Sequence, residues 1–292
     1  MKRTIFSSTG LVIVYLMAVI GFSSCSSNDG GTAFTGGGAP TVDGKNLKYI
    51  KEGYNVSILD YDTDGRVLSI LKNGVKTIYS YSDDQVTCTS TASGSAPSGY
   101  VVTYSLTGGR ITKKTNDEGN IVATYEYDAN GFLISYSTSE SSTSSDTSGS
   151  LTHTSSEKFT YTWKDGNIET VTRDFNSSNT HTYSYGYARS NSQTSHRVST
   201  YTYSSHTLTL PLFVVGDDEV LGWQGYFGRM SRNLPSKEQR VETQEFFDGT
   251  DNKVYTSTSS TEYVYSFNGN MLEKVTLTQD GYIFSVIELT WN

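Results

Sequence analysis

The stretch Ile121–Ser137, I-V-A-T-Y-E-Y-D-A-N-G-F-L-I-S-Y-S, alternates apolar or aromatic side chains with small or polar ones. This period of two predicts a strand, a tight turn at Asp128–Gly131 and a returning strand. An Asp side chain can hydrogen-bond its own backbone two residues on, and Asn followed by Gly supplies the positive φ of a hairpin turn. We therefore expect a β-hairpin here.

Imperfect copies of this phrase recur along the chain, with turns that contain Gly65, Gly109, Gly131, Gly166 and Gly269. Tyr alternates with Thr or Ser in most copies, which predicts an aromatic face and a small, polar face. Antiparallel sheets with one covered and one solvated face show this pattern. Helical spacing is almost absent, so we expect an all-β fold built as a large antiparallel β-meander of hairpins.

Ser- and Thr-dense stretches separate the copies. The largest is 137–157, a smaller one is 90–98, and others surround Ser177 and Ser190. They lack the apolar residues needed for packing, so the sequence predicts long, mobile hairpin loops.

One irregular insertion breaks the pattern at Pro211–Pro235. The acids at 217–219 favour the start of a short helix, whereas three glycines at 222, 225 and 228 each weaken it by about 1 kcal/mol. We expect a loop with one or two helical turns that packs over the end or the open face of the sheet.

The N-terminus has the features of a secretory signal. Lys2 and Arg3 precede an unbroken apolar run at 11–20, which is too short to cross a bilayer core of about 30 Å as a helix. The following G-F-S-S-C ends at Cys25 and resembles the lipobox of bacterial lipoproteins. The resemblance implies that residues 1–24 are a signal peptide and that Cys25 is lipidated; the alternative is a short anchor with an incidental Cys.

Residues 25–43 are rich in Ser and Gly and predict a flexible linker, with a reach of about 25 Å. Residues 44–292 suffice for a single all-β domain. The net charge of −8 argues against nucleic acid as a partner. Cys88 is expected to be a buried strand thiol, and lipidation of Cys25 leaves it no disulfide partner.

The lipobox, the Tyr-x-Tyr-Asp-x-x-Gly phrases and the stretch G-Y-F-G-R-M-S-R-N-L-P at 225–235 together resemble a Bacteroidota-type lipoprotein family. That family is a domain of unknown function with a porin-like β fold, and the resemblance covers about residues 45–292. It implies a closed or nearly closed, barrel-like sheet, and it brings no known activity and no functional residues. The phrases also resemble the YD repeats of large toxin shells, but they are too few and too irregular to build one.

A weak calcium candidate lies at Asp60, Asp62 and Asp64, because alternating acids before a Gly open a calcium loop. Leu71 stands where the closing acid belongs, so the alternative is a turn with additional acids. Glu126 and Asp128 are the closest match to a glycosidase pair, but such pairs usually come from separate strands. We therefore assign no catalytic residue, no metal and no cofactor.

The four histidines form no zinc-binding spacing and are expected to lie in exposed loops: His153, His181, His196 and His206.

Aromatic rings with a polar edge suit stacking on sugar rings. In the insertion, Trp223, Tyr226 and Phe227 are the residues that we assign to ligand binding, because no strand partner dictates them. The alternative is that these rings pack the core.

The leading hypothesis is a non-catalytic cell-envelope lipoprotein, anchored in the outer membrane and facing the periplasm or the cell surface. It would act as a binding module for a glycan, a peptide or a partner protein, since binding usually resides on loops held by a scaffold. One alternative is an integral outer-membrane β-barrel, and a further one is a polysaccharide hydrolase.

Overall fold

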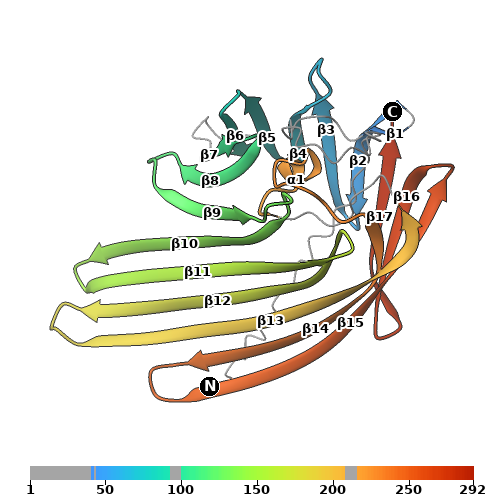
Figure 1. The fold of residues 1–292 in the computed structure, drawn as a ribbon. Coiled ribbons are helices and arrows are strands. Elements are labelled where there is room, and N and C mark those ends of the chain that lie inside the picture. Colours follow the sequence, from blue (N-terminus) through green and yellow to red (C-terminus); the bar gives the residue numbers. More distant parts are fainter. Residues whose placement is uncertain (1–40, 43, 93–99, 208–215) are drawn as a thin grey trace.

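The computed structural model describes residues 41–42, 44–92, 100–207 and 216–292. Each strand from β2 to β17 pairs antiparallel with the next one along the chain, and β17 returns to pair with β2. The protein is therefore a closed, 16-stranded antiparallel barrel (Figure 1), as the resemblance implies. Cys25, the signal peptide and most of the linker lie outside the described residues.

The strands are β1 (Thr41–Val42), β2 (Lys45–Glu52), β3 (Asn55–Tyr61), β4 (Val67–Lys72), β5 (Val75–Tyr81), β6 (Gln85–Ala92), β7 (Tyr100–Thr107), β8 (Arg110–Asn116), β9 (Ile121–Tyr127), β10 (Leu133–Asp146), β11 (Gly149–Lys164), β12 (Asn167–Tyr183), β13 (Ala188–Thr207), β14 (Asn233–Phe247), β15 (Asn252–Asn268), β16 (Met271–Gln279) and β17 (Tyr282–Trp291). The strand β1 adds to β2 at the start of the domain.

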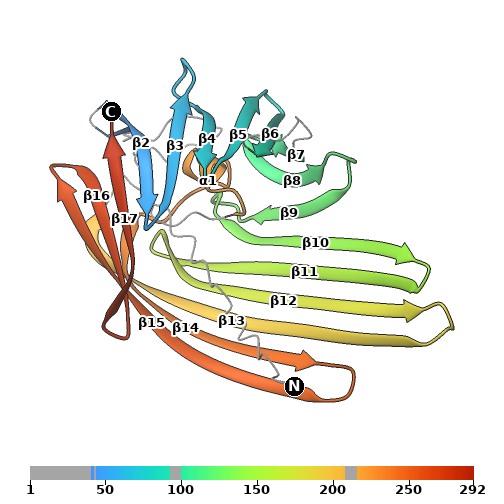
Figure 2. The ribbon, with the colours of Figure 1, turned by 180° about the vertical axis from the view of Figure 1, so that it is seen from behind.

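The barrel wall has very unequal height. Strands β2 to β9 have six to eight residues, whereas β13 has 20. As Figures 1 and 2 show, the hairpins β10–β11, β12–β13 and β14–β15 project far beyond the rest of the wall. We call these six strands, where they extend past β9 and β16, the projecting sheet.

The projecting sheet corrects one prediction, because three of the Ser- and Thr-dense stretches are strands and not loops, while residues 93–98 of the fourth lie outside the described residues. Residues 137–157 form most of the β10–β11 hairpin, and Ser177 and Ser190 lie in β12 and β13. Inside a wide sheet the backbone groups are paired whatever the side chains are. Thr also favours strands, and hydroxyls bond across strands, as between Thr154 and Ser178 at 2.8 Å.

The insertion forms a plug inside the short-walled part of the barrel. Its helix α1 (Glu219–Trp223) begins at Asp218, whose Oδ1 accepts a hydrogen bond from the amide of Leu221 at 2.9 Å. The expected helical turn is thus present; residues 211–215 lie outside the described residues. Residues 220–228 are all buried, so the plug fills the barrel and supplies the aliphatic and aromatic area that the wall lacks.

The tyrosine before each turn explains why the phrase repeats. Tyr61, Tyr81 and Tyr127 each donate a hydrogen bond to the carbonyl of a residue 14 to 16 positions earlier. That carbonyl lies near the start of the strand that directly precedes the tyrosine's own strand. Because the preceding strand is the second strand of the previous hairpin, each bond joins one hairpin to the previous one. Trp163 makes the same type of bond to the carbonyl of Leu133 at 2.8 Å. The repeated phrase therefore specifies both a turn and a side-chain hydrogen bond that joins neighbouring hairpins.

Candidate binding site

The three insertion aromatics that we assign to ligand binding lie in the core. The exposed fraction is 2% for Trp223, 5% for Tyr226 and 0% for Phe227. The ring of Tyr226 stacks on Tyr81 at 6.0 Å, and Phe227 lies 5.2 Å from Tyr125. None of the three offers a free face to a ligand, because the insertion turns into the barrel and not outward. The alternative that we kept open, packing, describes their positions.

A different aromatic cluster is exposed, at the tip of the β12–β13 hairpin. The rings of Tyr183 and Tyr185 lie 5.3 Å apart, those of Tyr185 and Tyr187 lie 6.5 Å apart, and the ring of His181 lies tilted against Tyr183 at 4.0 Å. Tyr185 is 75% exposed and Tyr187 is 57% exposed. Exposed clustered tyrosines are uncommon on surfaces that bind nothing, because they leave apolar area in water.

The turn holds these rings in place through its backbone. The amide of Tyr183 donates to the carbonyl of Tyr187 at 2.8 Å, and the amide of Gly186 donates to the carbonyl of Tyr183 at 2.9 Å. Gly186 has φ +87°, a conformation that other residues rarely adopt. The cluster is thus built on a closed turn that ends two long strands.

The three hairpin tips are also bonded to one another. The amide of Ser184 donates to the carbonyl of Ser148 in the β10–β11 turn at 2.9 Å. The guanidinium of Arg189 donates to the carbonyl of Asp248 in the β14–β15 turn at 3.1 Å. We call the turns 146–149, 183–188 and 247–252 together the tip surface. Because its parts are cross-linked, a ligand meets a preorganised surface.

Two carboxylates flank the tyrosines on the tip surface. Asp146 accepts hydrogen bonds from the amide and hydroxyl of Ser148, which lower its pKa. Hydrogen bonds from the amides of Asp251 and Thr250 and from the Thr250 hydroxyl lower the pKa of Asp248 to about 2. Both groups are ionised at neutral pH. The tip surface therefore combines apolar ring faces with fixed hydrogen-bond acceptors.

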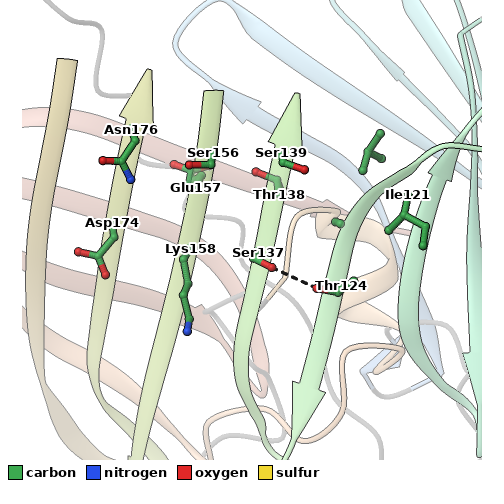
Figure 3. A pocket seen from close by; sticks show the side chains of 12 residues that line it. Ile121, Thr124, Ser137, Thr138, Ser139, Ser156, Glu157, Lys158, Asp174 and Asn176 are labelled. Carbon is green, nitrogen blue, oxygen red and sulfur yellow. Dashed lines mark hydrogen bonds between the residues drawn. The ribbon is translucent and has the colours of Figure 1, made fainter. Parts of the chain in front are cut away.

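A second, smaller feature is a groove on the wall where β9 begins beside the longer β10 (Figure 3). Its volume is about 390 Å³, and five of its twelve lining residues carry hydroxyls, with Ser137 bonded to Thr124 at 3.1 Å. Glu157, Lys158, Asp174 and Asn176 are its other polar groups (Figure 3). Asp174 is already bonded to a ring nitrogen of His196 at 2.6 Å. The groove lacks aromatic rings, so we regard it as an accessory surface.

The inner face of the sheet, the face that carries Tyr136 and the plug contacts, holds a buried polar network. Glu238 is 2% exposed and accepts hydrogen bonds from Ser199 at 2.7 Å, Arg240 at 2.9 Å and Tyr263 at 3.0 Å. This carboxylate is fully partnered, so the network is an internal stabilising element.

The acids of the plug are also engaged. Burial raises the pKa of Asp218 to about 6 and that of Glu219 to about 7. Asp217 pairs with Lys114 at 2.8 Å, and Glu219 pairs with Lys72 at 3.5 Å. Perturbed carboxylates often mark active sites, but these lie within the packed plug and contact structural partners.

The acids proposed as a calcium candidate do not converge. Asp62 accepts from the amides of Asp64 and Arg66, both Asp62 and Asp64 pair with the Arg66 guanidinium, and Asp60 accepts from Ser69. No group of three or more metal-ligating side chains is found among the described residues. Asp62 and Asp64 form a turn, which was the alternative, and Asp60 lies at the end of β3.

The other chemical candidates are likewise placed in strands and turns. Asp128 accepts from the amides of Asn130 and Phe132, as the hairpin prediction requires, and Glu126 accepts from Ser135. The prediction that the histidines lie in loops is wrong, because all four fall within strands. One of them, His181, is part of the tyrosine cluster.

The sequence contains a signal for the tip surface, but we interpreted it only as part of a strand. Three tyrosines at alternate positions in T-Y-S-Y-G-Y surround a single Gly. That spacing within a turn brings rings together, whereas the same spacing within a strand predicts packing. The position of the turn decides whether the three rings cluster at the surface or pack in a strand.

No protein-family model matches this chain, and no curated protein matches it either. In the part of the chain that the structure describes, no helix has the length and apolar character to cross a membrane. The functional argument therefore proceeds from the geometry of the tip surface.

Proposed function

We propose that the protein is a non-catalytic cell-envelope lipoprotein that binds a glycan through the tyrosine cluster of its tip surface. The lipid anchor at Cys25 and the linker would hold the barrel at the outer membrane. The observation that carries the proposal is the exposed, backbone-fixed stack of Tyr183, Tyr185 and Tyr187.

The chemistry of the surface supports a glycan as the ligand. Sugar rings present apolar C–H faces that pack on tyrosine rings, and their hydroxyls donate to carboxylates and accept from guanidinium groups. The tip surface supplies the acceptors Asp146 and Asp248, and Arg189, directly after the turn 183–188, supplies a donor. Tyrosine also loses little conformational entropy on binding.

The largely polar outer face of the long strands favours this proposal over an integral membrane barrel. Strands that face lipid carry apolar outward side chains. Here Lys51 and Glu288 form an exposed ion pair at 2.8 Å on neighbouring strands of the barrel. Outward positions of the long strands include Lys158 and Asp174, which lie opposite each other.

The test is a binding screen of the purified full-length lipoprotein in detergent against soluble glycans, followed by titration of each hit. Replacing Tyr185 with Ala should weaken binding by about tenfold or more, as expected for a central aromatic contact. The matched control is Tyr54→Ala, because Tyr54 is fully exposed at a turn outside the tip surface.

Equal loss in both variants, or no loss with Tyr185→Ala, would contradict the proposal. Binding of peptides in place of glycans, with the same dependence on Tyr185, would keep the site and change the ligand class.

A further inference from the structure

The projecting sheet has two free edges. Strand β10 pairs with β9 only as far as Thr138, and beyond it Ser139–Asp146 pairs with β11 alone among the described residues. Strand β15 pairs with β16 only from Thr261 onward, so Asn252–Ser260 pairs with β14 alone within the same described chain. Each edge thus presents a row of backbone donors and acceptors, which is a template for another strand.

The centres of both edges lack the usual protection against pairing, because the charges of Glu140, Asp146 and Lys253 lie near the ends. The centre of the β10 edge, residues 141–145, contains only Ser and Thr, without Pro, Lys or a bulge. The β15 edge carries the exposed strand-forming residues Val254 and Tyr255. Natural proteins normally place charges, prolines or bulges at such positions.

We propose that the β10 edge of one copy pairs with the β15 edge of a second copy, which continues the projecting sheet from molecule to molecule. The occupant of each edge is thus another copy of this chain. The inference goes beyond glycan binding and does not depend on it.

The strand directions fit this pairing. Strand β10 runs toward the tip surface and β15 runs away from it (Figure 1). When two copies stand side by side with their tips level, the two edge strands are antiparallel. Every other pair in the sheet has this arrangement.

The register also fits, over eight residues of each edge, 139–146 and 253–260. Cross-strand partners must lie on the same face, and Asp146 and Lys253 both share the inner face with Tyr136 and Phe159. Pairing Asp146 with Lys253 places Ser142 opposite Ser257 and Ser139 opposite Ser260. The last pair uses the final unpaired residue of each edge.

Charge selects this arrangement over the self-pairing of β10. In the proposed register the acid of Asp146 faces the ammonium of Lys253, a favourable cross-strand pair. Two β10 edges pairing antiparallel along their full length would bring Glu140 of each copy near Asp146 of the other. Because the two edges differ, the contact is heterologous and builds a ring or a chain of copies.

The experiment is disulfide trapping of the full-length lipoprotein in its membrane. Two differently tagged copies are co-expressed, one with Ser142→Cys and the other with Ser257→Cys, and a mild oxidant is added. Directly opposed residues of an antiparallel pair lie within disulfide distance. A disulfide-linked heterodimer is expected. Cys88 is buried and stays out of the reaction.

Three controls make the result decisive. A dimer formed by Ser142→Cys alone, or by Ser257→Cys alone, would show self-pairing of one edge and overturn the proposal. An intrachain disulfide in a single copy that carries both substitutions would show that the two edges of one molecule pair with each other. This result would also overturn the proposal. Thr154→Cys, on an interior strand, paired with Ser257→Cys should remain unlinked.

A second measurement uses charge and requires no new cysteine. Lys253→Glu should weaken association by about tenfold in analytical ultracentrifugation, because two acids would then face each other. Lys253→Arg should associate like the natural chain. A monomer in both the natural chain and Lys253→Arg, together with absent trapping, would refute the proposal.

Discussion

The hydroxyl of Tyr81 donates a hydrogen bond to the carbonyl of Val67 at 2.7 Å and accepts one from the side-chain amide of Gln224 at 2.8 Å. One side chain thus joins two hairpins of the wall to the plug. Because Tyr81 is the last strand residue before its turn, the same bond fixes where the turn begins. The repeat and the plug are therefore parts of one cooperative unit.

Tyr81→Phe should lower the free energy of unfolding by about 1 to 3 kcal/mol, since two buried partners lose a hydrogen bond. The ring remains and keeps its stack on Tyr226. Urea unfolding should show a lower midpoint with an unchanged slope. Tyr54→Phe, at a fully exposed side chain, should leave the midpoint unchanged.

Two arginines of the inner face should respond very differently to removal. Arg240 donates twice to the buried Glu238, so Arg240→Met leaves that carboxylate without its cation and should cost about 3 to 5 kcal/mol. The guanidinium of Arg197 makes no ion pair or hydrogen bond within the described residues. Burial and repulsion from Arg240 and Arg173 lower its pKa.

Arg197→Met should therefore change stability by less than about 1 kcal/mol or increase it. Chemical denaturation of the two variants side by side provides the check. Equal losses for both would mean that Arg197 also stabilises the network.

The pH dependence of stability should be governed in part by Glu219. Burial raises its folded-state pKa from 4.5 to about 7, while Lys72 opposes the shift. The folded protein binds the proton more tightly, so this contribution to stability is present below pH 4.5 and is lost as the pH rises to about 7.

Glu219→Gln should remove that loss and be more stable than the natural chain at pH 8 by about 2 kcal/mol. Thermal unfolding between pH 4 and pH 8 measures both curves. The exposed Glu245→Gln is the control. Parallel curves for Glu219→Gln and the natural chain would show that the carboxyl is not desolvated.

The projecting strands should be protected from hydrogen exchange although they are almost entirely polar. Residues 176–182 of β12 lie between β11 and β13, and their backbone groups pair with both strands. Exchange of their amides should therefore be slow. The amide of Tyr185, within the turn, should exchange rapidly. Mass spectrometry of overlapping peptides resolves the two regions. Rapid exchange throughout 176–187 would restore the loop interpretation.

The turns of this fold could be predicted from the sequence, whereas the polar strands could not. The turn glycines were predicted from their neighbours, and Gly65, Gly109, Gly131, Gly166 and Gly269 all have positive φ. The strand character of the polar stretches was missed, because a lack of apolar residues was taken to exclude strands. A strand with a partner on each side needs no apolar face of its own, and such partners are a property of the whole sheet.

The candidate site was missed for a related reason. Trp223 was predicted to bind a ligand because it belongs to no predicted strand. For the same reason, the insertion that carries it is able to fold into the barrel. Tyr185 looked like a strand residue, and only the position of Gly186 in the turn exposes it. The N-terminal assignments, including lipidation of Cys25, stay predictions.

Gly186 offers a way to test whether the geometry of the tyrosine cluster matters, and not only its composition. At φ +87° an Ala is strained by about 1 kcal/mol, although its Cβ would meet no atom within 4 Å. Gly186→Ala should therefore open the turn that joins Tyr183 to Tyr187 and weaken binding of any ligand of the tip surface. All three rings are retained in this variant. Gly119→Ala, at φ +81° in another turn with open space around it, carries a similar strain away from the cluster and should leave binding unchanged. Titration of one ligand against both variants decides the point, because equal affinities would show that the rings act without the fixed turn.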